Sequence, residues 1–220
     1  MTFLKKVENI AGTSNFDSNS AYTTYKDMIS EFLTESARAV LDVLPDKVLI
    51  KDSIQISIED NTGVDVTDKK IVKVNREGYG CVEMPLEEKA HLEAGSGSIK
   101  EPTRRSPVYY IEGQASTGGK LFIKPNPASN QKGTLDYSGY PSVAWNNSSI
   151  TNFPDLAEYA VVIGSALRLL QHKMNLLIHD DEDIELAQVV QQELLNVSEM
   201  YKDEIMRLNG QMGKVTDGNK

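Results

Sequence analysis

Three segments of the chain repeat hydrophobic residues at helical spacing. In residues 20–44, apolar side chains recur at steps of three to five and form one stripe, and Pro45 ends the helix because proline has no N–H to donate. Residues 154–178 and 181–209 show the same periodicity. Ala157, Ala160 and Gly164 give the second segment small side chains, which let helices approach closely. We therefore expect it to lie between two neighbours.

Between the first and second of these segments, the pattern changes to alternation. The sequence VLIKDSIQISI places apolar residues at every second position around Ile54, Ile56 and Ile58, which is typical of a half-buried strand. The segments PVYYIEGQ and KLFIKPNP predict a hairpin, and LDYSGYPSVAW supplies another extended piece. Short strands at this spacing predict a small antiparallel sheet or a barrel-like sandwich.

The order of these elements predicts an α+β fold, a helical bundle of three main helices with an inserted small antiparallel β module. Residues 20–46 and 150–209 would form the bundle, and residues 47–149 the β module. Residues 1–19 would be an N-terminal arm with room for a short helix, since Phe3, Val7 and Ile10 share helical spacing. Residues 210–220 would be a flexible C-terminal tail.

Charge and composition narrow the function classes. The net charge of −9 disfavours a protein that grips nucleic-acid phosphates, because such binding needs clustered Lys and Arg. The only cysteine, Cys81, excludes an internal disulfide and a cysteine-built zinc site. No apolar run reaches the ~18 residues of a membrane-spanning helix, and the N-terminus lacks the apolar core of a secretory signal. We expect a protein made in a reducing cytoplasm and not bound to a membrane.

No motif in the chain has the spacing of a catalytic centre, a cofactor site or a metal site. His172 and His179 stand seven residues apart, which is not the spacing of a chelating pair on a helix. The sequence Gly78–Tyr79–Gly80 does not lead into a helix, as a phosphate-binding loop would. We therefore predict no catalytic residue, no cofactor and no metal. A hydrolase is the least favoured class.

Two kinds of residue are better candidates for an interface. Aromatic residues gather in the β region, where a sheet core is the simpler interpretation, although Tyr and Trp are also enriched at interfaces. Arg104 and Arg105 form a basic pair that fits either a solvated loop or a contact with DNA or an acidic partner. The last helix carries more apolar residues than one neighbour needs. The interface candidates are Tyr137, Tyr140, Trp145, Leu186, Leu195, Met200, Arg104 and Arg105.

The segment from Lys120 to about Leu177 resembles the head-to-tail connector (adaptor, or neck) proteins of tailed bacteriophages. The residues that carry the resemblance are FIKPNP, then LDYSGYPSVAW, then ITNFPDLAEYAVVIGSALRLLQHK. The resemblance implies a virion structural protein without catalysis, which assembles in the host bacterial cytoplasm into a ring, typically of twelve copies. The ring would bind the portal protein on one side and the tail or a second neck protein on the other.

In such a ring the negative charge would line a channel through which DNA passes without specific binding. A different class remains open. The β region alone would suit a non-catalytic binding protein, a glycan or peptide accessory domain that uses Tyr137 and Tyr140. Assembly into a ring would distinguish the connector protein from the binding protein.

Overall fold

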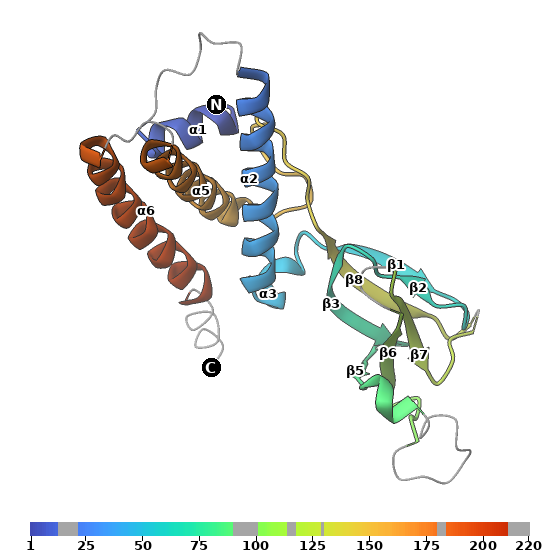
Figure 1. Ribbon diagram of the computed structural model, residues 1–220. Coiled ribbons are helices and arrows are strands. Elements are labelled where there is room, and N and C mark those ends of the chain that lie inside the picture. The colour runs from blue at the N-terminus through green and yellow to red at the C-terminus, as the bar shows by residue number, and fades with distance from the viewer. Residues whose placement is uncertain (13–21, 90–100, 114–117, 129, 180–183, 211–220) are drawn as a thin grey trace. The chain divides into compact units, whose positions relative to one another are not determined.

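The computed structural model describes residues 1–12, 22–89, 101–113, 118–128, 130–179 and 184–210 (Figure 1). The chain divides into two compact units. A helical unit comprises Met1–Pro45 and Tyr140–Lys220, and a β unit comprises Asp46–Gly139. The β unit is thus inserted between two segments that fold together.

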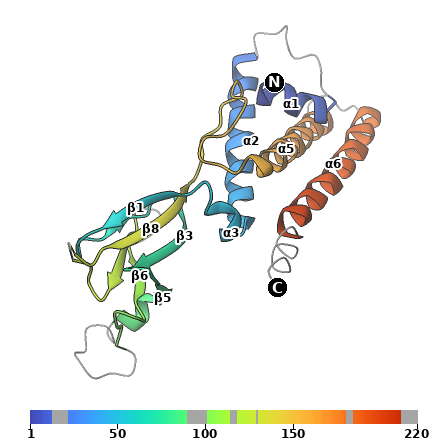
Figure 2. The ribbon, with the colours of Figure 1, turned by 180° about the vertical axis from the view of Figure 1, so that it is seen from behind.

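The helical unit contains α1 (Phe3–Ile10), α2 (Tyr22–Val43), the 3-10 turn η2 (Asp155–Ala157), α5 (Glu158–His179) and α6 (Ile184–Gly210). Helix α5 packs against α1, α2 and α6 and lies between α2 and α6 in both views (Figures 1 and 2). Consecutive side chains from Ala160 to Leu170 are buried or half-buried on all sides. The prediction that this helix lies between two neighbours is confirmed.

At Gly164, both α2 and α6 approach α5 closely. A Cβ at this position would lie 3.2 Å from Ser36 Oγ of α2 and 3.2 Å from Tyr201 Cε2 of α6. These distances are tighter than ordinary van der Waals contact, so α2 and α6 both come close to α5 because this residue has no side chain.

The β unit begins with the short helix α3 (Asp46–Leu49) and contains two four-stranded sheets. The first has the order β1-β8-β3-β4 and the second the order β2-β7-β6-β5. The strands are β1 (Ile54–Ile58), β2 (Val64–Asp65), β3 (Lys69–Arg76), β4 (Tyr79–Gly80), β5 (Val82–Glu83), β6 (Val108–Glu112), β7 (Lys120–Lys124) and β8 (Gly133–Gly139), with the 3-10 turn η1 (Leu86–Glu88) after β5.

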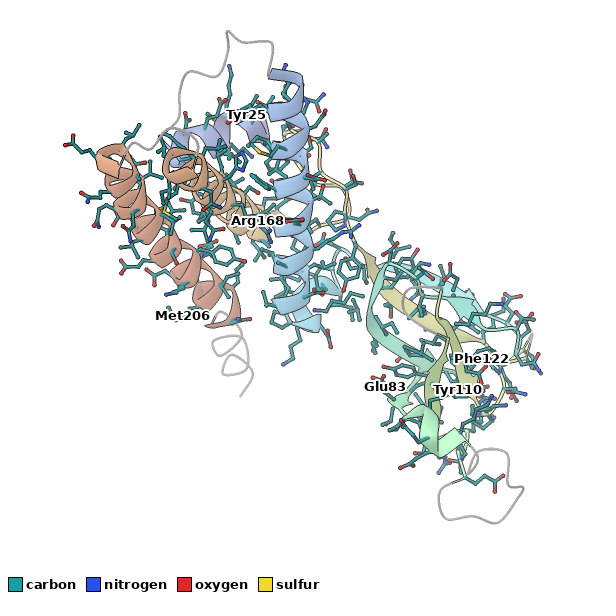
Figure 3. The ribbon with its side chains drawn as sticks, in the orientation of Figure 1. Tyr25, Glu83, Tyr110, Phe122, Arg168 and Met206 are labelled. Carbon is teal, nitrogen blue, oxygen red and sulfur yellow. The ribbon has the colours of Figure 1, made fainter. Side chains whose placement is uncertain are left out.

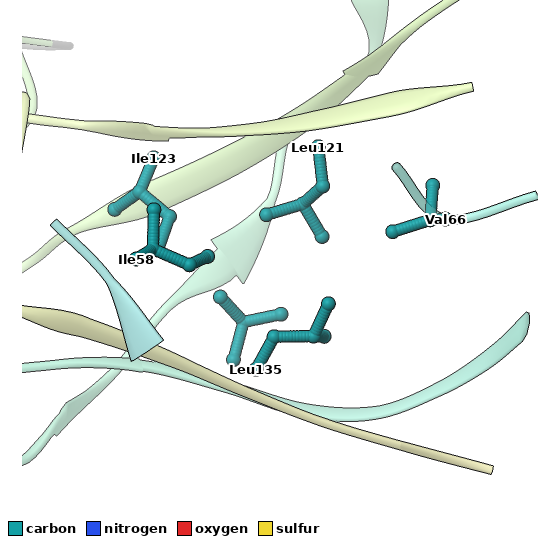
Figure 4. Close-up of a cluster of buried hydrophobic side chains, with 6 residues drawn as sticks. Ile58, Val66, Leu121, Ile123 and Leu135 are labelled. Carbon is teal, nitrogen blue, oxygen red and sulfur yellow. The ribbon is translucent and has the colours of Figure 1, made fainter. Parts of the chain in front are cut away.

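Apolar side chains from both sheets meet in one core (Figure 4). Ile58 and Leu135 come from the first sheet, and Leu121 and Ile123 come from the second. The predicted hairpin is confirmed, because β6 and β7 pair antiparallel with Val108 opposite Lys124. The alternation around Ile56 and Ile58 corresponds to the face of β1 that packs into this core.

The predicted fold, a bundle of three main helices with a small antiparallel β module, is wrong. The described residues form an α+β fold with five α-helices and two four-stranded sheets. Helix α1 adds a fourth helix to the helical unit because Phe3, Leu4 and Val7 are buried there. The second sheet is mixed, since β5 pairs parallel with β6.

Candidate interaction surface

A segment without helix or strand, residues 140–145, lies along one side of α2. Every fourth residue of α2 contacts this segment, because positions four apart share one face of a helix. The contacting residues are Lys26, Ser30, Thr34, Arg38 and Asp42. Two of the predicted interface residues, Tyr140 and Trp145, belong to this segment.

Hydrogen bonds to its backbone hold the middle of the segment in place. The Val143 N–H donates to Thr34 Oγ1 at 3.0 Å, and the Thr34 hydroxyl is 3.4 Å from the Val143 carbonyl oxygen. The Trp145 N–H donates to Ser30 Oγ at 3.1 Å, and the Trp145 carbonyl accepts from the Leu4 N–H at 3.0 Å. The segment thus joins α2 to α1.

The two aromatic side chains reinforce these bonds. The Tyr140 hydroxyl donates to Asp42 Oδ1 at 2.6 Å, and the Lys26 Nζ lies 4.3 Å from the centre of the Trp145 ring. Both rings are half-buried. Tyr140 and Trp145 therefore stabilise the helical unit through contacts within the chain.

The remaining predicted aromatic, Tyr137, lies in the β unit. It is half-buried on β8, opposite Ile54 of β1 and Ile71 of β3, and it packs against the core. The Lys69 Nζ lies 5.4 Å from its ring centre. The sheet-core interpretation of this residue is confirmed.

Arg104 contacts a carboxylate of its own unit. Its Nε lies 2.7 Å from Glu77 Oε2, and its Nη2 donates to Glu77 Oε1 at 2.8 Å. Glu77 also accepts from Nη1 of the buried Arg76 at 3.0 Å. One carboxylate thus faces two guanidinium groups. Arg105 is exposed beside this cluster.

The predicted residues of α6 are exposed, but they lie on different faces. Leu186 and Met200 are about 40° apart around the helix axis, whereas Leu195 is about 180° from Leu186 at 100° per residue. Two further exposed apolar residues, which the sequence analysis did not select, extend these faces: Val189 lies near Met200, and Met206 lies near Leu195. We call Leu186, Val189 and Met200 the inner strip, and Leu195 and Met206 the outer strip.

A groove runs over α5 between α2 and α6. Its volume is about 270 Å³, and its lining residues are Ser36, Ala39, Gly164, Leu167, Arg168, Gln171 and Tyr201. Arg168 is the only charged residue of this lining, and its Nη1 forms an ion pair with Glu35. Burial raises the pKa of the Tyr201 hydroxyl. Figure 3 shows Arg168 on α5 and Met206 near the C-terminal end of α6.

Two other side chains that could act chemically, those of Cys81 and His172, pack within the protein. Burial raises the pKa of the Cys81 thiol to about 11, which makes it a poor nucleophile at neutral pH. The ring of His172 packs edge-on against Phe32, with 6.4 Å between ring centres. His91, the acidic residues 180–183 and the tail 211–220 lie outside the described residues.

The part of the chain that the structure describes contains no group of three His, Cys, Asp or Glu residues able to hold a metal ion. None of its helices has the length and apolar character needed to cross a membrane. Neither a protein-family model nor a curated protein matches the chain.

Proposed function

We propose that the chain is a virion structural protein, a head-to-tail connector subunit that forms a ring between a portal protein and a tail. The observation that carries this proposal is the surface of α6. Five of its large apolar side chains are exposed, namely Leu186, Val189, Leu195, Met200 and Met206. A helix of a monomeric protein needs one apolar face. In this helix the inner strip widens one edge of the buried face, and the outer strip lies on the opposite side of the helix.

The distribution of charge supports the same proposal. The β unit is nearly neutral, with 13 Lys and Arg against 14 Asp and Glu, whereas the helical segments contain 10 against 18. The helical unit therefore holds almost all of the net charge of −9. Repeated around a ring, this charge would repel DNA phosphates and let the DNA pass without binding.

The alternative, a binding protein that uses the β-region aromatics, is less well supported. The Tyr140 hydroxyl is bound to Asp42, and the Tyr109 hydroxyl donates to Glu83 Oε2 at 3.1 Å. The ring of Tyr110 stacks on Phe122 with 5.4 Å between ring centres. Each of these side chains already has a partner within its own unit.

Portal binding tests the proposal. The full chain is mixed with the portal protein encoded by the same genome, and the complex is measured by co-sedimentation. We expect a stable complex that the inner-strip variant Leu186→Glu/Met200→Glu weakens at least about tenfold. The control Gln192→Glu changes an exposed polar residue of the same helix and should bind like the wild type. A wild-type chain that leaves the portal unbound would contradict the proposal.

A further inference from the structure

We infer that the open edge of β1 pairs with an extended strand of a partner protein, a strand that has apolar residues at every second position. Strand β1 lies at the edge of the first sheet, so it has a neighbouring strand, β8, on one side only. On the other side, every second residue of β1 directs its N–H and C=O groups away from the sheet. These backbone groups are the site of the proposed pairing.

The other edge strands are too short to offer such a site. Strands β4, β2 and β5 form the remaining edges of the two sheets, and each has two residues. Short edge strands are one means by which proteins prevent pairing with other chains. Among the described edge strands, β1 alone has five residues and can pair along a longer stretch.

Strand β1 also lacks the other features that protect an edge. Its sequence, IQISI, contains no charged residue and no proline, and its five pairs with β8 follow one another in unbroken register, without a bulge. Among the described residues, no backbone hydrogen bond joins Ile54–Ile58 to a segment other than β8. The outer edge of β1 is therefore free to accept a strand.

The two faces of β1 define the chemistry of the partner strand. Ile54 shares the core-facing side of β1 with Ile56 and Ile58. Ile58 is only 3% exposed, whereas Ile54 is 36% exposed and Ile56 is half-buried. Gln55 and Ser57, on the other side, are exposed. An added strand with alternating apolar and polar residues would cover the two exposed isoleucines and continue both faces of the sheet.

The proposed function selects a different protein as the source of this strand, and the inference rests on it to this extent. Antiparallel pairing of two β1 strands would relate two copies of the chain by a two-fold axis. A ring subunit contacts its neighbours through heterologous surfaces instead. The two-residue strands β2, β4 and β5 offer no edge that a neighbouring copy could add to β1.

A synthetic peptide tests the open edge. The probe is the peptide KTVTVTVK, which alternates threonine with valine, and the control peptide KVVVTTTK has the same composition without alternation. Hydrogen exchange of the full chain is measured by NMR. Without peptide, every second amide of β1 should exchange fast, because it has no acceptor. The alternating peptide should slow these amides at least about tenfold, and the control peptide should not.

Two variants locate the effect on β1. Ile54→Lys places a charge on the core-facing side of the edge and should abolish the slowing by the alternating peptide. Ile50→Lys is the matched control, because Ile50 is 43% exposed but precedes the strand, and it should keep the slowing. Thermal unfolding establishes that both variants fold, and the peptide measurements on the wild type do not depend on them.

The outcomes separate this pairing from the proposed function. An alternating peptide that leaves the exchange of β1 unchanged, equal slowing by both peptides, or full slowing in folded Ile54→Lys would each overturn the pairing. A native mass that falls in Ile54→Lys, measured by light scattering, would identify a second copy as the occupant and would overturn it too. Portal binding of the wild type, measured separately by co-sedimentation, decides the proposed function in either case.

Discussion

Among the described residues of the β unit, Arg76 is the most buried charged residue, with 3% of its side chain exposed. Besides Glu77, its guanidinium binds Gln131 Oε1 at 2.9 Å and lies 3.4 Å from the Asn126 carbonyl oxygen. The Glu77 carboxylate is the only charge that the described residues place within ion-pair distance of it. Glu77 thus compensates a charge that has left water.

We expect Glu77→Gln to lower the free energy of unfolding by about 3 kcal/mol, because it leaves the buried Arg76 without its counter-charge. Urea denaturation measures the effect. The control is Glu59→Gln, which removes an exposed ion pair with Lys132 and should cost less than about 1 kcal/mol. Equal effects of the two variants would contradict this role of Glu77.

Cys81 offers a pH-dependent test. Since the thiolate is the reactive form and burial raises the thiol pKa to about 11, alkylation of the native protein by iodoacetamide should be slow at pH 8. The rate should rise with pH and reach half its maximum near 11. The unfolded protein in urea is the control, with an expected midpoint of about 8.5. The same midpoint in both states would refute the shift.

Ala160 tests the close packing of α5. Its side chain is fully buried where the helix has neighbours on all sides, so Ala160→Leu should lower the free energy of unfolding by about 1–3 kcal/mol. Thermal unfolding measures this change. Tyr159→Trp enlarges the adjacent residue, which is exposed, and should change stability by less than about 0.5 kcal/mol. An unchanged melting temperature for Ala160→Leu would count against the close packing.

At the scale of elements, α2 packs against other helices and also accepts hydrogen bonds from the backbone of the segment 140–145. Thr34→Val replaces a hydroxyl that accepts from the Val143 N–H with a methyl group of similar size. We expect a loss of about 1–2 kcal/mol, since the amide of the buried Val143 then lacks a partner.

Hydrogen exchange localises this loss. The Val143 amide should exchange faster in Thr34→Val, whereas the amides of the β-unit core should be unaffected. Glu31→Gln, a change at an exposed position of α2, is the control for both measurements. If protection of Val143 were the same in all three proteins, the hydrogen bond to Thr34 would not hold the segment.

The elements differ in how well the sequence predicts them. The apolar period of α2 and the alternation around Ile56 and Ile58 of β1 are readable from the sequence, because each places apolar side chains on one face of its element. The pairing of β5 with β6 is not predictable in this way. Val82 and Glu83 are too few to alternate, and their partners, Val108 and Tyr109, lie far along the chain. The fourth-residue contacts of α2 involve polar side chains, which an apolar pattern does not reveal.

The contacts of individual site residues are also not predictable from the sequence. Tyr140 and Trp145 are aromatic residues beside a helix, and their sequence does not tell whether they face a partner or their own chain. Their bonds to α2 depend on how the chain returns from the β unit. The sequence alone could have identified Met206 as an interface candidate, because it lies about 20° from Leu195 on a helical projection.

At the scale of the whole molecule, a nearly neutral β unit is inserted into a strongly acidic helical unit. The helical unit has a groove with one arginine and a helix with two exposed apolar strips. In our proposal the inner strip contacts the portal. Each copy in the ring then adds its negative charge, and the summed charge repels the DNA phosphates.

Native mass measured by light scattering, on the full chain alone and with the portal protein from the same genome, tests this proposal most directly. We predict a discrete multimer of a single size, formed either by the chain alone or on the portal. A chain that remains monomeric under both conditions would contradict the connector proposal.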